Sequence, residues 1–434
     1  MKIRNLEELA TTPARKDALL IAEAGLLSID TAAVLDRILK IEGDRLHIGN
    51  KSYPLEHGGR LIAILVGKCA AEGAAVFDRI LGGRIDSGAA LGVGPGKDAG
   101  NIRYYQGTHP MPSPDNVKGT GALLKELHGL TANDTVLFLI SGGGSTLLVQ
   151  PPCVAERMDE LVAKEAAALK GLFKSGASIQ EINTLRKHMS LARGGFLAAA
   201  AHPARAISII FSDVPGNDLE FIASGPTVKD LTTVKDAEDI MRRYGLDLDK
   251  ECLTETPKDD EFFSRASNVL ALSNATALNA MKEKAIELGY SAVIQNSCLT
   301  GEASEVGPAL AADIDSAAPG TVILYCGETT VTIDGKGGKG GRNQQVALSA
   351  LPHVKSGRLV ISLASDGRDN GPHAGAIADA NVLEVARSKK LDLADFAARN
   401  DSSTFFETLG DGLIETGDTG SNVSDLLMAL AEKK

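Results

Sequence analysis

The sequence predicts an α/β protein made of two α/β domains, each built around a largely parallel sheet. Three observations carry this prediction: continuous apolar runs, helical stretches that follow several of them, and a length of 434 residues. Strands buried on both faces read as unbroken apolar runs, which is typical of parallel sheets covered by helices. A chain of this length is long for a single core, so we expect two domains.

The elements follow in order along the chain. Up to about Lys40, apolar residues recur at helical spacing and predict two helices. Six apolar runs then predict strands, of which the first three are expected to be buried on both faces, and helices are expected after the first run (69–80) and after the fourth (274–288). The predicted strands span residues 61–66, 135–140, 206–211, 269–272, 321–326 and 359–363.

A charge-dense stretch between about Lys229 and Arg265 has little apolar continuity. We therefore expect a Rossmann-like N-terminal domain over residues 1–265 and a C-terminal α/β domain over 266–434, with a cleft between them. The same stretch is equally compatible with two exposed helices.

Composition excludes several classes of protein. The 45 Lys and Arg against 56 Asp and Glu give a net charge of −11, which argues against nucleic-acid binding. No apolar run approaches the length of a membrane span, and no signal peptide is evident at the N-terminus. Five cysteines without paired spacing predict buried free thiols in a cytoplasmic protein. Assembly into a homo-oligomer stays open.

Glycine-rich polar turns directly follow two of the expected strands. Ser141, Gly142, Gly143, Gly144 and Ser145 come after the second strand, where successive backbone amides suit a phosphate. A flexible turn is the alternative. Lys68 follows the first strand at a position where open α/β sheets bind ligands. Lys68 is therefore a candidate cation for neutralising a transferred phosphoryl group. The alternative is a structural Lys whose ammonium extends into solvent.

Further charged residues sit at similar positions. Asp213 and Asp366 each follow a Ser after a predicted strand, so they are candidates for Mg²⁺ binding or for orienting a hydroxyl, with turn capping as the alternative. Gly340, Gly341 and Arg342 join a glycine-rich basic loop to a helix and predict a phosphate site rather than a disordered linker.

Weaker candidates complete the predicted site. Arg186 and Lys187 are adjacent cations that can hold a carboxylate or phosphate of a substrate, or lie on a solvated helix face. Glu328 ends another strand and is a candidate ligand for substrate. Asn274 begins a helix after a strand and is placed with the nucleotide- and phosphate-binding residues. The nominal dinucleotide pattern at residues 94–99 opens no predicted helix, so we treat it as a false positive.

Taken together, these motifs resemble the bacterial and archaeal glycerate 2-kinase family, whose C-terminal half is called the MOFRL domain. The motifs that carry the resemblance lie at residues 139–145, 183–188, 212–217, 223–227, 340–344 and 365–367. The resemblance implies ATP- and Mg²⁺-dependent phosphorylation of D-glycerate to 2-phosphoglycerate in a cleft between two domains. It also implies that Lys68 and Arg342 are the catalytic cations, acting on the transferred phosphoryl group from opposite domains.

The chain departs from the family pattern at three places. Arg193 stands where a Lys is common, and the loops at 368–373 and 417–422 differ from the usual sequences. These departures bear on the identity of the hydroxy acid more than on the type of reaction. The alternatives are a kinase for a related small hydroxy acid, an NAD(P)H-dependent hydroxypyruvate reductase, and a non-catalytic metabolite-binding protein.

Overall fold

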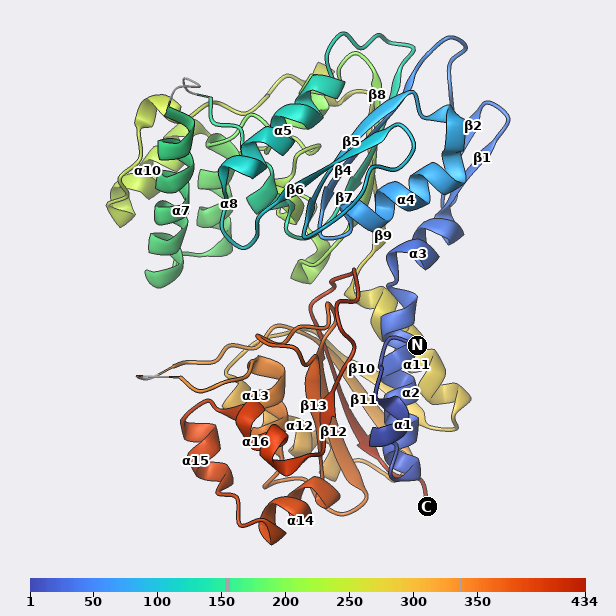
Figure 1. The fold of residues 1–434 in the computed structure, drawn as a ribbon, viewed down its shortest axis with the longest axis vertical. Helices are drawn as coiled ribbons and strands as arrows, with labels where there is room; N and C mark the ends of the chain where they lie inside the picture. Colours follow the sequence, from blue (N-terminus) through green and yellow to red (C-terminus); the bar gives the residue numbers. More distant parts are fainter. Residues whose placement is uncertain (153–156, 334, 336) are drawn as a thin grey trace. The chain divides into compact units, whose positions relative to one another are not determined.

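The chain forms two compact units in a computed structural model that describes residues 1–152, 157–333, 335 and 337–434 (Figure 1). One unit contains Thr31–Ala271, and the other combines Met1–Asp30 with Leu272–Lys434. The N-terminal domain expected over residues 1–265 differs from this division in its first 30 residues, which belong with the C-terminal part of the chain. A helical pattern reveals an apolar face but not the element that it packs against. The cleft expected between two domains stays a prediction.

The unit Thr31–Ala271 is built on a six-stranded sheet of order β6-β5-β4-β7-β8-β9. The pairs from β6 through β8 are parallel, which confirms the α/β class. Consecutive strands run outward from β4 in one direction and then from β7 in the other, so the connections reverse at the β4–β7 pair. The strands are β4 (Leu61–Gly67), β5 (Ser87–Val93), β6 (Ile102–Gly107), β7 (Thr135–Ile140), β8 (Arg205–Phe211) and β9 (Ala266–Leu272).

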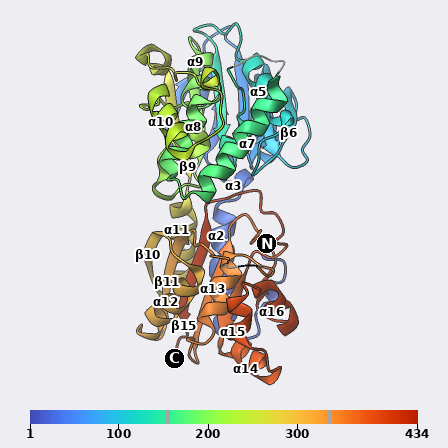
Figure 2. The same ribbon diagram turned by 90° about the vertical axis from the view of Figure 1, so that its left-hand side faces the viewer.

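Helices and a small antiparallel sheet complete this unit. Helices α7, α8 and α10 enclose an apolar core of their own (Figure 2). The charge-dense stretch expected at the domain boundary instead contributes α10 to this core. The helices are α3 (Thr31–Ile38), α4 (Ala70–Leu81), α5 (Pro114–Glu126), α6 (Gly144–Leu147), α7 (Met158–Lys174), α8 (Ile179–His188), α9 (Phe196–Ala201) and α10 (Val234–Tyr244), and the small sheet is β1 (Leu39–Glu42), β2 (Arg45–Ile48) and β3 (Lys51–Pro54).

The second unit contains a mixed sheet of order β10-β11-β15-β12-β13-β14. The β10–β11 pair is parallel, whereas β15 runs antiparallel to both β11 and β12. The prediction of a largely parallel sheet is therefore correct for the first unit but not for this one. Here β15, the last strand of the chain, lies between β11 and β12 and is antiparallel to both, and β13 is antiparallel to β12. The strands are β10 (Ser291–Leu299), β11 (Thr321–Gly327), β12 (Arg358–Ala364), β13 (Gly375–Asp379), β14 (Leu413–Ile414) and β15 (Asp425–Ala431).

Helices cover both faces of this mixed sheet. Figure 1 shows α1, α2 and α11 on one face and the helices α12–α16 on the other. The second face packs on a large apolar core that includes Phe405 and Phe406. The helices are α1 (Leu6–Leu9), α2 (Pro13–Ser28), α11 (Asn274–Glu287), α12 (Ala303–Asp315), α13 (Arg342–Ala350), α14 (Ala380–Ser388), α15 (Leu393–Ala398) and α16 (Ser402–Leu409).

The cysteines differ from the expected set of buried free thiols. Cys69 and Cys326 are free and buried, but Cys298 is free and exposed. Cys252 is disulfide-bonded, so the expectation is wrong for it. Cys153 lies outside the described residues. Within the described ranges, no single helix is long and apolar enough to cross a membrane, and only the bent pair α2–α3 meets that test by length and composition.

A buried ion-pair network fixes α2 to the second unit. The Arg15 guanidinium, fully buried, donates to Asp379 through Nε (2.5 Å) and Nη2 (2.9 Å) and to Asp411 through Nη1 (2.9 Å) and Nη2 (3.0 Å). Burial alone lowers the pKa of Arg15, but the two carboxylates outweigh it and raise that pKa. Asp379 also accepts from the Val382 amide at the start of α14.

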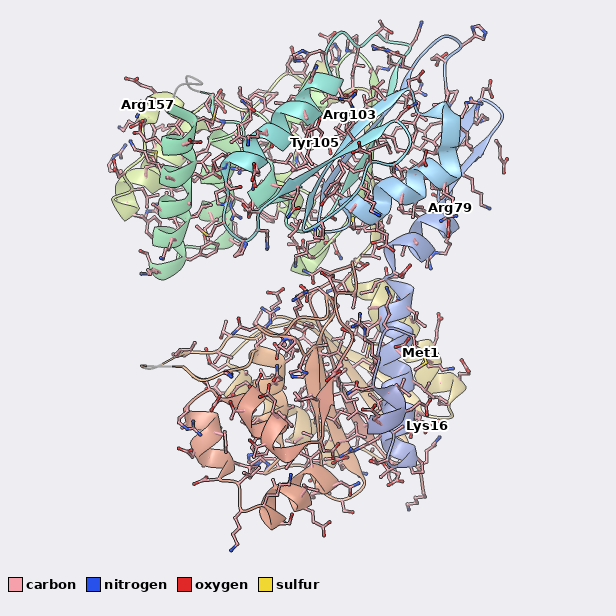
Figure 3. The ribbon with its side chains drawn as sticks, viewed as in Figure 1. Met1, Lys16, Arg79, Arg103, Tyr105 and Arg157 are labelled. Atoms are coloured by element: carbon pink, nitrogen blue, oxygen red, sulfur yellow. The ribbon has the colours of Figure 1, made fainter. Side chains whose placement is uncertain are left out.

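We expect Arg15→Ala to destabilise the second unit by about 3–5 kcal/mol, because it leaves buried carboxylates without their partner. Thermal and denaturant unfolding measure the effect. The matched control is Lys16→Ala, since Lys16 is the next residue of α2 and is exposed (Figure 3). Equal stability of the two variants would contradict the importance of this network.

Candidate active site

Lys68 and the turn at residues 141–145 meet where the β4–β7 pair ends. The Lys68 amide donates to the Gly142 carbonyl (2.9 Å), and the Ser141 amide donates to the Val66 carbonyl (3.0 Å). Gly67 adopts φ +118°, and a Cβ there would collide with Ser141. In doubly wound sheets, ligands bind at the carboxyl ends of the strands where the connections reverse. The structure therefore places Lys68 and the glycine turn at the favoured ligand position of this unit.

Asp213 joins this group from the end of β8. A Cβ added to Gly142 would collide with the Asp213 carboxylate, so the absence of a side chain at 142 is what lets the acid approach the turn. Gly143, at φ +84°, lies next to Lys68 and His109: a Cβ there would be 3.4 Å from Lys68 Cγ and 3.8 Å from His109 Nε2. The sequence analysis missed His109, which follows β6.

A second turn, at Ala223 and Ser224, packs against the glycine turn. Ala223 and Ser224 adopt φ +52° and +59°, a conformation that costs a non-glycine residue about 1–2 kcal/mol. The Ser224 hydroxyl, fully buried, donates to Asn183 Oδ1 (2.7 Å) and lies 2.9 Å from Ser145 Oγ. Because an amide oxygen can only accept, the single Ser224 proton is used on Asn183, and the Ser145 hydroxyl is the donor in its contact with Ser224. Strain held in place by buried hydrogen bonds is typical of functional sites.

Arg186 is one turn further along α8 from Asn183. It is 9% exposed, and its Nε is buried without a hydrogen-bond partner among the residues that the structure describes. Burial, together with the neighbouring guanidinium of Arg193, lowers the pKa of Arg186 to about 10. Arg193 donates to Glu165 (2.8 Å) and to the Arg186 carbonyl (3.1 Å), so the single carboxylate of this cluster is already used by Arg193. The cluster is therefore one negative charge short, which suits an anionic ligand.

Lys187 is in a different environment from its neighbour. Its ammonium is buried and binds Glu220 (2.9 Å) and Asp230 (3.0 Å). These contacts occupy the cation in a structural network, so they give no support to the predicted substrate role. Adjacent residues of a helix point about 100° apart, and the sequence does not tell which of two neighbouring cations already has partners.

Arg342 forms the centre of a second group, in the other unit. Arg342 begins α13 and donates to Asp425 through Nε (2.5 Å) and Nη2 (3.1 Å), while its Nη1 lies 3.1 Å from Glu328. In the sheet, Asp425 is opposite both Gly327 of β11 and Ala364 of β12. Burial raises the pKa of Asp425, and the hydrogen bonds from Arg342 partly oppose this shift. Glu328 thus contacts a catalytic candidate, whereas the sequence analysis missed Asp425.

Gly340 and Gly341 are tightly packed rather than flexible. A Cβ on Gly341 would collide with the Asp369 carboxylate, and one on Gly340 would collide with the Ser402 hydroxyl. Asp369, buried, accepts from the backbone and side-chain amides of Asn343 (3.0 and 3.2 Å) and Gln344 (2.8 and 3.1 Å). Its burial raises its pKa. In the described part of the chain, the Gly340 and Gly341 amides donate to no protein acceptor.

Two further predicted residues are accounted for by their contacts. Asp366 Oδ1 accepts from the Arg368 amide (3.1 Å). This contact caps the turn, which is the structural alternative given above for Asp366. Asn274 donates to the Ser297 carbonyl (2.7 Å) and so connects α11 to β10. That contact gives no support to nucleotide binding by Asn274. The described residues contain no group of three or more His, Cys, Asp or Glu side chains that could hold a metal ion.

Comparison with known proteins covers nearly the whole chain. A family model described as a domain of unknown function, DUF4147, matches residues 17–254, and the MOFRL family model matches residues 321–425. A glycerate 2-kinase from Pyrococcus horikoshii is 35% identical over 96% of this chain and 96% of its own. A D-glycerate 2-kinase from Thermotoga maritima is 35% identical over 86% and 90% of the two chains.

Other relatives include one with a different activity in its name. A putative hydroxypyruvate reductase from Agrobacterium vitis is 37% identical over 86% of this chain and 88% of its own. Among solved structures, a crystal structure of a glycerate kinase from Thermotoga maritima superposes with a TM-score of 0.82 at 31% identity, covering 96% of this chain and 99% of that one.

Proposed function

The chain belongs to the glycerate 2-kinase family, and we propose that it transfers a phosphoryl group from ATP to the 2-hydroxyl of D-glycerate to give 2-phosphoglycerate. The observation that carries this proposal is the group formed by Lys68, the glycine turn and Asp213 at the reversal point of the first sheet. Cations and backbone amides are what phosphoryl transfer requires, because the transferred group is held and neutralised rather than covalently activated.

Lys68 and Arg342 are the proposed catalytic cations. Arg342 is preorganised by Asp425 and Glu328, so little conformational entropy is lost when it meets a phosphate. Backbone amides of Gly142 and Gly143 are the proposed phosphate ligands of the first unit, because the Gly144 amide donates to the Ser141 carbonyl (3.3 Å) and the Ser141 hydroxyl donates to the Val66 carbonyl (3.3 Å). As the bond from phosphorus to the leaving oxygen of ADP breaks, negative charge develops on that oxygen and on the phosphoryl oxygens, and fixed donors stabilise this charge.

Arg186 is the proposed ligand for the carboxylate of the acid. A guanidinium pairs with a carboxylate through two parallel hydrogen bonds. In the described part of the chain, Arg186 has no partner for Nε and Arg193 is paired with Glu165, so an incoming acid would supply a negative charge for Arg186. We keep Glu328 as a positioning residue for Arg342, and we do not carry Lys187 or Asn274 forward.

Asp213 is the proposed protein ligand for Mg²⁺. Magnesium in kinases is commonly bound by one or two carboxylates together with substrate phosphates, and a single carboxylate against the glycine turn fits that mode. Bound there, the metal would neutralise phosphate charge. Asp366 is the second candidate from the sequence, on the other unit.

A hydroxypyruvate reductase is the alternative, since some relatives carry that name. A reductase of this fold class binds its dinucleotide through a glycine-rich turn that opens the first helix after the first strand. Here that turn is Gly67-Lys68-Cys69, and Gly67 is packed against Ser141. Residues 94–99 open no helix either. These features favour the kinase.

Initial rates with D-glycerate, hydroxypyruvate, ATP and NADH in separate combinations test the function directly. We expect ADP release that depends on both ATP and D-glycerate, and 2-phosphoglycerate as the product. Oxidation of NADH by hydroxypyruvate without ADP release would make the protein a reductase and reject the kinase.

Replacing Lys68 or Arg342 by Ala should each lower kcat by roughly two to three orders of magnitude, as expected for lost transition-state donors. If both side chains act on one phosphoryl group, the double variant should lose less than the product of the two single effects. Lys118→Ala, an exposed lysine of the first unit, serves as the control. Near-normal turnover of Lys68→Ala at saturating ATP would remove Lys68 from the mechanism.

Arg186→Met should raise the KM for D-glycerate by about 10- to 100-fold, the range expected for lost charge-assisted hydrogen bonds. The KM for ATP should stay unchanged, and Arg186→Lys should recover part of the loss because it restores the charge. A purely structural Arg186 would instead change thermal stability and leave both KM values as they were.

Asp213→Asn should increase the Mg²⁺ concentration needed for half-maximal rate by at least about tenfold, because a neutral amide is a weak ligand for this ion. Magnesium titrations of the kinase rate in the wild type, Asp213→Asn and Asp366→Asn measure this shift. A shift confined to Asp366→Asn would move the proposed metal ligand to the other unit.

A further inference from the structure

A cavity of about 400 Å³ lies within the unit that contains Leu272–Lys434. Its lining combines three kinds of group: apolar side chains, side-chain amides, and the backbone that leads into α13. Small-molecule sites of 300–1,000 Å³ typically show this combination of an apolar wall with a few placed polar groups. The lining residues that matter below are Val331, Ile333, Gly340, Gly341, Arg342 and Gln345.

Gln345 supplies a polar group that lacks a partner. Its Nε2 donates to the Ala397 carbonyl (3.1 Å), which fixes the orientation of the amide because a carbonyl can only accept. The other end of the amide, Oε1, is buried and has no hydrogen-bond partner within the described ranges, in a side chain that is 3% exposed. An unpaired buried acceptor costs about 1–3 kcal/mol, so a ligand N–H or O–H donor at this place is favoured.

Ile333 and Val331 supply the apolar part of the cavity lining. Ile333 is 57% exposed, which is unusual for a large apolar side chain, and it lines the cavity together with the partly buried Val331. Apolar surface of this kind suits a flat aromatic ring, because contact with the ring removes that surface from water. A three-carbon acid such as D-glycerate offers no such ring.

The start of α13 gives the cavity an end suited to phosphate. The amides of Gly340 and Gly341 donate to no acceptor within the described residues, and the Arg342 side chain beside them is 34% exposed. Asp369 also lines the cavity, but the amides of Asn343 and Gln344 already bind its carboxylate. An apolar wall, a buried acceptor and a cationic end thus lie in one cavity.

We propose that this cavity binds the nucleoside of ATP, with the base against Ile333 and Val331 and its exocyclic amine donating to Gln345 Oε1. The phosphates then extend toward the Gly340 and Gly341 amides and Arg342. The inference rests on the proposed kinase function and adds to it the place of the nucleotide. It also gives a reason for base selectivity: guanine carries a carbonyl oxygen where adenine carries its amine, and two acceptors repel.

The test compares Ile333→Ala and Gln345→Met with the wild type, using ADP titration and initial-rate kinetics with ATP, GTP and D-glycerate. Ile333 is exposed, so its truncation is compatible with folding, and it keeps the test meaningful if Gln345→Met is unstable. Ile286→Ala is the matched control, because Ile286 is similarly exposed (54%) on α11 of the same unit and does not line the cavity.

We expect each cavity variant to weaken ADP binding and raise the KM for ATP by about tenfold, with the KM for D-glycerate unchanged. Gln345→Met should also reduce the preference for ATP over GTP. Unchanged ADP affinity in Ile333→Ala would overturn the proposal, and so would a rise confined to the KM for D-glycerate. If the wild type binds ADP and the variants lose it while no kinase rate is detected, the nucleotide site stands and the kinase function fails.

Discussion

The candidate site of the first unit depends on the contact between the ends of β4, β7 and β8, where two glycine positions have no room for a side chain. Gly67 packs against Ser141, and Gly142 packs against the Asp213 carboxylate. These approaches bring Lys68, the glycine turn and Asp213 to one place, and that place is where the connections of the parallel sheet reverse. The glycines are therefore required for close approach, more than for flexibility.

Buried charges organise the rest of each unit. In the second unit, Arg15 holds α2 against Asp379 and Asp411, and Arg342 is held by Asp425 and Glu328. These guanidinium groups have carboxylates to pair with, so they stabilise one geometry. Around Arg186 the balance differs, because two guanidinium groups share one carboxylate. Burial without compensation is costly, and it is tolerated mainly where a ligand completes the charge.

Asp369 shows how a helix start can be reserved for structure. Its carboxylate takes the amides of Asn343 and Gln344, which would otherwise face a ligand at the beginning of α13. The Gly340 and Gly341 amides, just before the helix, donate to no acceptor among the described residues. The predicted phosphate site therefore has two parts. In the described residues, the amides of Gly340 and Gly341 have no acceptor, whereas those of Asn343 and Gln344 donate to Asp369.

The sequence by itself determined the α/β class, the six strands that read as continuous apolar runs, and the turns that carry Lys68, Ser141–Ser145, Asp213 and Arg342. It did so because strands buried on both faces are apolar throughout and because polar glycine turns mark their ends. The exception is β9, an edge strand that is largely unburied and includes the exposed Leu270. It did not predict β5, β10, β13 or β15: glycines interrupt β5 and polar residues interrupt β10, whereas β15 is apolar throughout after Asp425. Only the tertiary structure decided that the first 30 residues join the second unit and that β15 brings Asp425 to Arg342. It also decided that Lys187 is paired, while Arg186 Nε has no partner in the part of the chain that is described. Each of these depends on which distant group a side chain meets, and local periodicity holds no information about that.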